Sequence, residues 1–132
     1  MLTCTGLLFF DNPQAVSSLF GDACDLWSVE IPEVALGREG SVLRLRFDVP
    51  VVPSCMPSKW PAGSNTTQIT IAAWGIESLE IAGWTSQVSG EFTVSQLGDL
   101  LTLSFTSMCC HIQASFGYLR IERVNGLSGR SL

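Results

Sequence analysis

The chain has 132 residues, of which 46% are hydrophobic and 14% are charged, and its net charge at neutral pH is −5. This amount of apolar side chain offsets the conformational entropy of folding, so the composition excludes intrinsic disorder and predicts one domain over residues 1–132. An acidic chain is repelled by phosphate backbones and anionic headgroups, so neither nucleic acid nor a membrane is an expected partner.

Targeting signals and cysteine usage both point to the cytoplasm. No apolar run approaches the roughly 20 residues that a membrane helix needs, and no Lys or Arg precedes the short run at residues 7–10. We therefore expect a cytoplasmic protein. Five cysteines are spaced irregularly, without a C-x-x-C pair, which predicts reduced thiols and neither a disulfide framework nor a zinc site. They are Cys4, Cys24, Cys55, Cys109 and Cys110.

The first predicted element is a short helix. Residues 11–13, Asp-Asn-Pro, offer a capping side chain followed by a proline at the first helical position. Apolar residues then recur at helical spacing from Val16 to Phe20, and Gly21 ends the pattern. The apolar residues 7–10 before the helix are either a brief strand or a segment that packs against it.

Two alternating runs then predict a β-hairpin. Trp27, Val29 and Ile31 share one face, Pro32 interrupts the pattern, and Val34 and Leu36 continue it to a Gly-Arg-Glu-Gly turn at residues 37–40. Proline cannot donate to a neighbouring strand, so Pro32 predicts that this strand lies at a sheet edge. The second run, residues 43–49, alternates apolar residues with Arg44, Arg46 and Asp48, as in an antiparallel strand with one solvated face.

Residues 50–65 contain four prolines and several small residues, which predicts a long loop. Lys59 and Trp60 lie within it. Two interpretations of Trp60 stay open. Its ring either plugs the core from outside, which the cost of exposing a large apolar group favours, or it is offered to a partner.

Further alternating runs predict the remaining strands. With one N-terminal helix and no helix between strands, about seven or eight strands predict a mainly β fold, either an antiparallel sandwich or a strongly curved sheet over a single core. The runs are Gln68–Trp74, Ile76–Trp84, Glu91–Leu97, Leu101–Thr106 and Ile112–Phe116, with Leu119 and Ile121 closing the series.

The sequence contains one combination of reactive side chains, Cys109-Cys110-His111. A cysteine nucleophile beside a histidine base is a known arrangement, but Cys110 and His111 would point to opposite faces of a strand, and no third group nearby would orient the ring. Three contiguous residues also wrap a metal ion poorly. We expect a strand start with buried thiols, and no enzyme activity, cofactor or metal.

Several short motifs, taken in order, resemble a family of immunity proteins from bacterial polymorphic toxin systems, known as immunity protein 50. The series spans nearly the whole chain. Its members are Asn-Pro at 12–13, Leu-Arg-Phe-Asp at 45–48, Pro-Ser-Lys-Trp at 57–60, Gly-Trp at 83–84, and Leu-Arg-Ile-Glu-Arg-Val at 119–124 with Asn-Gly at 125–126. The resemblance implies a cytoplasmic protein that binds a cognate toxin domain and blocks it. It also implies buried, structural roles for Phe47, Trp60 and Trp84.

The surface residues give two hypotheses of different classes. For a toxin-binding protein that inhibits by occlusion, we place the partner contacts at Lys59, Trp60, Glu77 and Glu80 and expect a monomer when the protein is free. The alternative is a small-ligand or structural β-sandwich module without catalysis, in which three tryptophans line one pocket. These are Trp60, Trp74 and Trp84.

Overall fold

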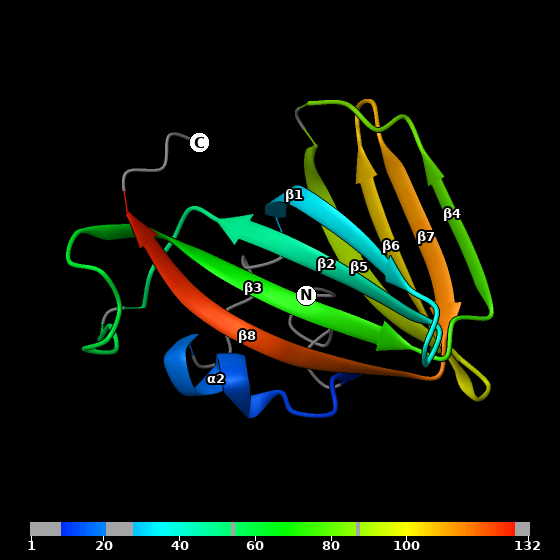
Figure 1. Cartoon of the computed structure of the whole chain (residues 1–132), viewed down its shortest axis with the longest axis horizontal. Helices are drawn as coiled ribbons and strands as arrows, with labels where there is room; N and C mark the ends of the chain where they lie inside the picture. The colour runs from blue at the N-terminus through cyan, green and yellow to red at the C-terminus, as the bar shows by residue number, and fades with distance from the viewer. Residues whose placement is uncertain (1–8, 21–27, 54, 87, 129–132) are drawn as a thin grey trace.

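The alternating runs assemble into one open sheet of eight antiparallel strands, with a short helix against one side (Figure 1). The computed structural model describes residues 9–20, 28–53, 55–86 and 88–128. Leu7 and Trp27, which the sequence placed in a lead-in segment and in the first strand, lie outside these residues. Because all eight strands belong to one open sheet, the prediction of a strongly curved sheet is confirmed, and the alternative of a two-sheet sandwich is not.

The helix is α2 (Gln14–Phe20), as the Asp-Asn-Pro start predicted. No helix in the described part of the chain is long and apolar enough to cross a membrane. The strands are β1 (Ser28–Gly37), β2 (Val42–Val49), β3 (Ser64–Trp74), β4 (Ser78–Ala82), β5 (Ser89–Leu97), β6 (Leu100–Ser107), β7 (His111–Phe116) and β8 (Tyr118–Ser128).

The spatial order of the strands is β4-β7-β6-β5-β1-β2-β3-β8. Figure 1 shows two fans of strands that meet at β1, one made of β1, β2, β3 and β8 and the other of β5, β6, β7 and β4. We call these the β8 half and the β4 half, after the edge strand of each. Their inner faces share one core, in which Phe47 of β2 lies tilted against Phe92 of β5 with the ring centroids 4.7 Å apart.

Pro32 lies in an interior strand, so the prediction of a sheet edge there was wrong. β1 pairs with β5 through Ser28–Glu30, and its register with β2 shifts between Glu30 and Glu33. Pro32 falls in that irregularity, where its missing N–H interrupts no regular ladder. The irregularity is the point at which β1 passes from the β4 half to the β8 half.

The residues before α2 lie along the outer edge of β8. The backbone N–H of Asp11 donates to the Leu119 carbonyl over 2.6 Å, and Phe10 forms a parallel bridge to the same residue. The Asn12 side chain donates from Nδ2 to the Ile121 carbonyl and accepts at Oδ1 from the Ile121 N–H, each over 2.8 Å. Asn12 thus occupies the hydrogen-bonding groups of an edge strand, in place of the helix-capping role that its position suggested.

Candidate partner-binding surfaces

The Cys109-Cys110-His111 segment forms a turn that leads into β7. Cys110 is 2% exposed and belongs to the core, whereas the His111 ring lies on the outer face with Nε2 3.3 Å from Gln113 Oε1. Burial, and then the neighbouring Cys109 thiol, raise the pKa of Cys110, which disfavours the thiolate needed for nucleophilic attack. The predicted divergence of Cys110 from His111 is confirmed. Cys109 is exposed, so the expectation that both thiols are buried was wrong for that residue.

A protein metal site needs three or four suitable ligand side chains close together. Among the residues that the structure describes, no three or more His, Cys, Asp or Glu side chains gather in a way that would hold an ion.

Trp60 plugs the core from outside, as one of the two sequence interpretations held. The side chain is 8% exposed, and its ring lies so close to Gly126 of β8 that a Cβ built on the glycine would be 2.3 Å from Cε3 of the ring. The preceding Lys59 is exposed. The buried ring therefore anchors the loop and holds Lys59 at the surface.

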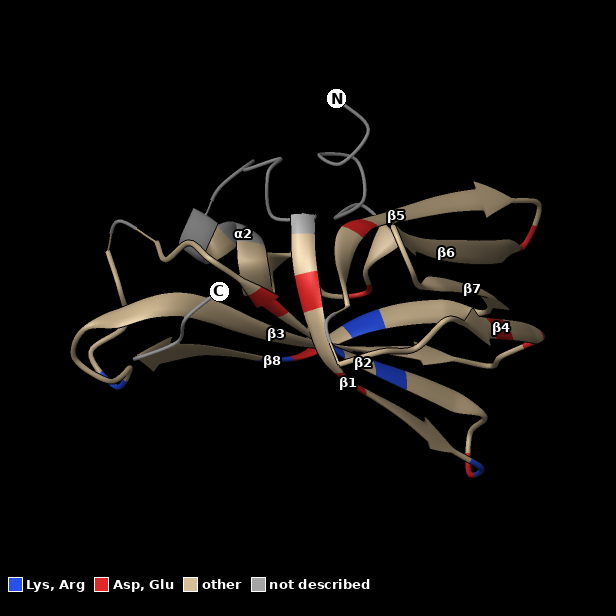
Figure 2. Cartoon of the chain, turned by 90° about the horizontal axis from the view of Figure 1, so that it is seen from above, with Lys and Arg blue, Asp and Glu red and all other residues tan. Residues whose placement is uncertain are grey.

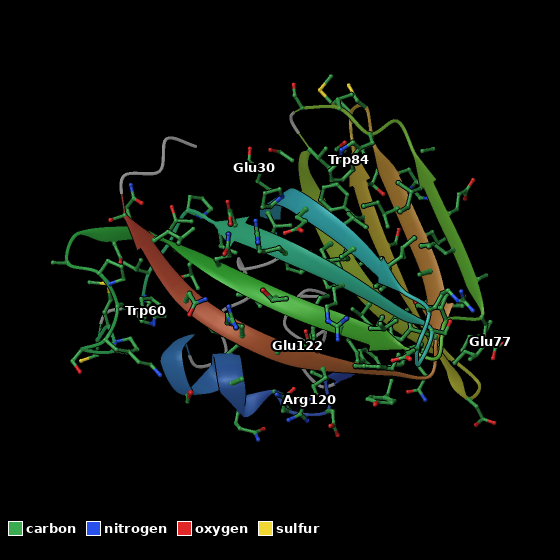
Figure 3. The ribbon with its side chains drawn as sticks, viewed as in Figure 1. Glu30, Trp60, Glu77, Trp84, Arg120 and Glu122 are labelled. Atoms are coloured by element: carbon green, nitrogen blue, oxygen red, sulfur yellow. The ribbon has the colours of Figure 1, made fainter. Side chains whose placement is uncertain are left out.

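The three tryptophans of the small-ligand hypothesis lie apart from one another. Trp74 at the end of β3 stacks on Tyr118 with the ring centroids 6.3 Å apart. Figure 3 shows Trp60 and Trp84 far apart, Trp60 beside β8 and Trp84 at the top of the β4 half. Trp84 is 47% exposed, so the expectation that it is buried was wrong. It follows the edge strand β4, beyond which no described strand covers it.

A hollow of about 640 Å³ opens between α2, the loop around Trp60 and β8. Three cationic side chains line it: Lys59, Arg120 and Arg123. Arg120 is paired with Asp11 through a 2.8 Å contact between Nη1 and Oδ2. Glu122 also lines the hollow, so its rim carries three cations and one carboxylate, and Asp11 neutralises part of the positive charge.

The outer face of the β8 half carries a second, smaller hollow of about 320 Å³, lined by arginines from β2 and β8. Arg46 reaches Glu33 across the β1–β2 pair at 2.8 Å, and Arg44 reaches Glu122 on β8 at 2.8 Å. Cations and carboxylates alternate on this face, so its net field is small.

The β4 half has a different electrostatic character. Between Pro61 and Leu119 the sequence contains no Lys or Arg, whereas it contains four carboxylates: Glu77, Glu80, Glu91 and Asp99. Figure 2 accordingly shows no Lys or Arg on β4, β5, β6 and β7. Among the described residues, the β4 half thus carries four carboxylates and no cation, whereas the remainder carries six carboxylates together with six cations, so the net negative charge lies on the β4 half.

The four residues predicted from sequence as partner contacts fall at two separate places. Glu77 and Glu80 are exposed at and just before β4, and Lys59 and Trp60 lie beside α2 and β8. Figure 3 shows Trp60 and Glu77 at opposite ends of the sheet. The structure therefore offers an acidic surface and a basic surface, and the four residues do not form one patch.

The sequence was also compared with known protein families. Residues 12–127 match the family described as Immunity protein 50. The chain belongs to that family. The Immunity protein 50 match runs from Asn12 on the β8 edge to Leu127 near the end of β8, so it covers α2 and the whole sheet except the last residue. No curated protein and no solved structure matches the chain.

Proposed function

We propose that this member of the Immunity protein 50 family binds a cognate toxin domain in the cytoplasm and neutralises it by covering its active surface. Membership of an immunity-protein family supports a toxin as partner. The protein would act by occupancy, without catalysis and without a cofactor. Its free form would be a monomer.

The uneven distribution of charge over the two halves of the sheet indicates which surface binds the toxin in this proposal. The β4 half holds four carboxylates and no cation, so its field attracts a basic protein surface and steers its approach. Glu77 and Glu80 are exposed there and are the contacts that we propose for a basic toxin face. Trp60 would contribute indirectly, by anchoring the loop that presents Lys59 at the other end of the sheet.

Growth of cells that express the toxin gene encoded beside this one tests the proposal. Co-expression of this chain should restore growth, and the two proteins should co-purify. Cells that die despite a well-folded, abundant chain would contradict it. The toxin released from the complex by denaturation and refolding should have an unchanged mass and regain its activity, because occlusion alters no covalent bond. A covalently modified toxin would instead indicate an enzyme.

A further inference from the structure

The two edge strands of the sheet, β8 and β4, differ in whether other residues occupy their outward backbone groups. On the β8 edge, Asp11 and Asn12 take up backbone groups of Leu119 and Ile121, and Asp11 also pairs with Arg120. On the β4 edge, β7 is the one strand partner within the described chain. Alternate residues of such an edge direct their N–H and C=O groups outward, where they remain available to another strand.

We infer that β4 is the docking edge for the toxin, and that the occupant is an extended, basic segment of the toxin which adds a ninth strand to the sheet. This inference rests on the proposed immunity function. Strand addition gains affinity from main-chain hydrogen bonds and specificity from the side chains on each face of the added strand.

The side chains of β4 define what the added strand must carry. Glu80 lies on the outer face beside Gln113, and Glu77 precedes the strand. Leu79 and Ile81 lie on the opposite face, beside Ala114 and Ile112 of the core. The matching strand therefore alternates Lys or Arg toward the Glu80 face with apolar residues toward the Leu79 face.

The apolar face has room for a side chain from the partner. Leu79 borders a hollow of about 330 Å³, which is also lined by Leu36, Val42 and Ile76 and, from the β1–β2 turn, by Gly37, Arg38 and Ser41. Leu36 is 63% exposed and Ile81 is 37% exposed, which leaves apolar surface for an added strand to cover. Burial of such surface would stabilise the complex in addition to the main-chain bonds.

A second copy of the chain fits this edge poorly. Two β4 strands paired antiparallel about their centres would place Glu80 opposite Glu80, because β4 runs from Ser78 to Ala82. Like charges directly opposite each other destabilise a strand pair. The same carboxylate that discourages self-pairing attracts a basic strand, so the charge of this edge selects the partner.

Hydrogen exchange on the complex tests the inference directly. The probe is the purified toxin domain encoded beside this gene, carrying a substitution that silences its activity. Amides of residues 78–82 should exchange more slowly in the complex, while those of the β8 edge should be unchanged. A complex in which residues 78–82 stay unprotected would overturn the inference and leave the immunity function standing.

A matched pair of substitutions gives a second test. Glu80→Lys on β4 and Glu91→Lys on β5 change the charge equally on exposed positions of the same half. We expect Glu80→Lys to weaken toxin binding by about 10-fold more than Glu91→Lys, because only the former faces the added strand. Equal losses would overturn the edge assignment. Dimerisation of the chain through β4 would also overturn the edge assignment. Failure of the toxin to bind the wild-type protein would overturn both this inference and the immunity function.

Discussion

Arg44 and Glu122 form a two-point ion pair across the outer face, although 78 positions separate them in the sequence. Arg44 Nε lies 2.8 Å from Oε1 and Nη2 lies 3.3 Å from Oε2. The two residues belong to β2 and β8, which are not neighbours, so the pair spans β3 at the fully buried Ala72. The guanidinium also lies 5.4 Å from the centroid of the Trp74 ring. The hydrogen bond from Arg44 to Glu122 raises the pKa of the guanidinium, so it stays charged throughout the accessible pH range.

Truncation of Arg44 should cost more stability than neutralisation of its partner. The ion pair is partly exposed, so Glu122→Gln should lower the free energy of unfolding by less than about 1 kcal/mol. Arg44→Ala should lower it by about 1–2 kcal/mol, because the arginine stem and guanidinium also cover Ala72 and the Trp74 ring. Urea unfolding of both variants measures the difference. Equal losses would mean that the charge pair, and not the packing, stabilises this face.

Gly126 should tolerate no side chain while Trp60 is present. A methyl group there would overlap the indole, so Gly126→Ala should lower the free energy of unfolding by about 1–3 kcal/mol and shift the tryptophan emission to the red. The control is the same substitution in a Trp60→Leu background, in which the smaller side chain leaves room. An undiminished loss in that background would refute a clash with the Trp60 ring as the cause.

Asn12 should be sensitive even to an isosteric change. Asn12→Asp keeps the acceptor for the Ile121 N–H but loses the donor to the Ile121 carbonyl, and it places a carboxylate against that oxygen. We expect a loss of at least about 1 kcal/mol in the free energy of unfolding, with more aggregation as the β8 edge opens. Unfolding by urea and light scattering measure these two effects. Wild-type behaviour of Asn12→Asp would show that the Nδ2 bond contributes nothing.

The adjacent thiols should differ sharply in reactivity. At neutral pH, iodoacetamide should label the exposed Cys109 and leave Cys110 unmodified, because the latter is buried and its pKa is raised. Fragmentation of the labelled peptide by mass spectrometry assigns the two positions. Labelling of Cys110 as fast as Cys109 in the folded protein would contradict its placement in the core.

The same pKa shift predicts a pH dependence of stability. Because the folded protein holds Cys110 neutral, its contribution to stability is complete below the ordinary thiol pKa, about 8.5, and declines as the pH rises above that value. Between about pH 8 and 10, wild-type protein should lose more stability than Cys110→Ala. If the stabilities of the two proteins fall equally with rising pH, ionisation of Cys110 is not the cause of the fall.

Local periodicity accounts for the parts of the fold that were predictable. The alternation in residues 43–49 places Leu43, Leu45 and Phe47 in the core because a strand directs successive side chains to opposite faces. The order of strands within the sheet leaves no such local signal. Pro32 was consequently placed at an edge, although β1 lies between β5 and β2.

Locating the candidate surfaces requires the order of the strands, which the sequence does not show. Glu77 and Glu80 were recognisable as outward-facing, but the exposure of Trp84 follows from β4 being an edge strand, which only the assembled sheet reveals. The contact of Arg44 with Glu122 likewise requires β2, β3 and β8 to lie side by side. The lack of Lys and Arg between Pro61 and Leu119 was the one sequence signal that would have located the acidic half.

Titration of the purified toxin domain with this protein tests the central claim most directly. With the activity of the toxin as the readout, we predict complete loss of activity at one chain per toxin, and weaker inhibition as added salt screens the acidic β4 half over a Debye length of about 10 Å or less. Toxin activity that stays unchanged in the presence of excess folded protein would contradict the claim.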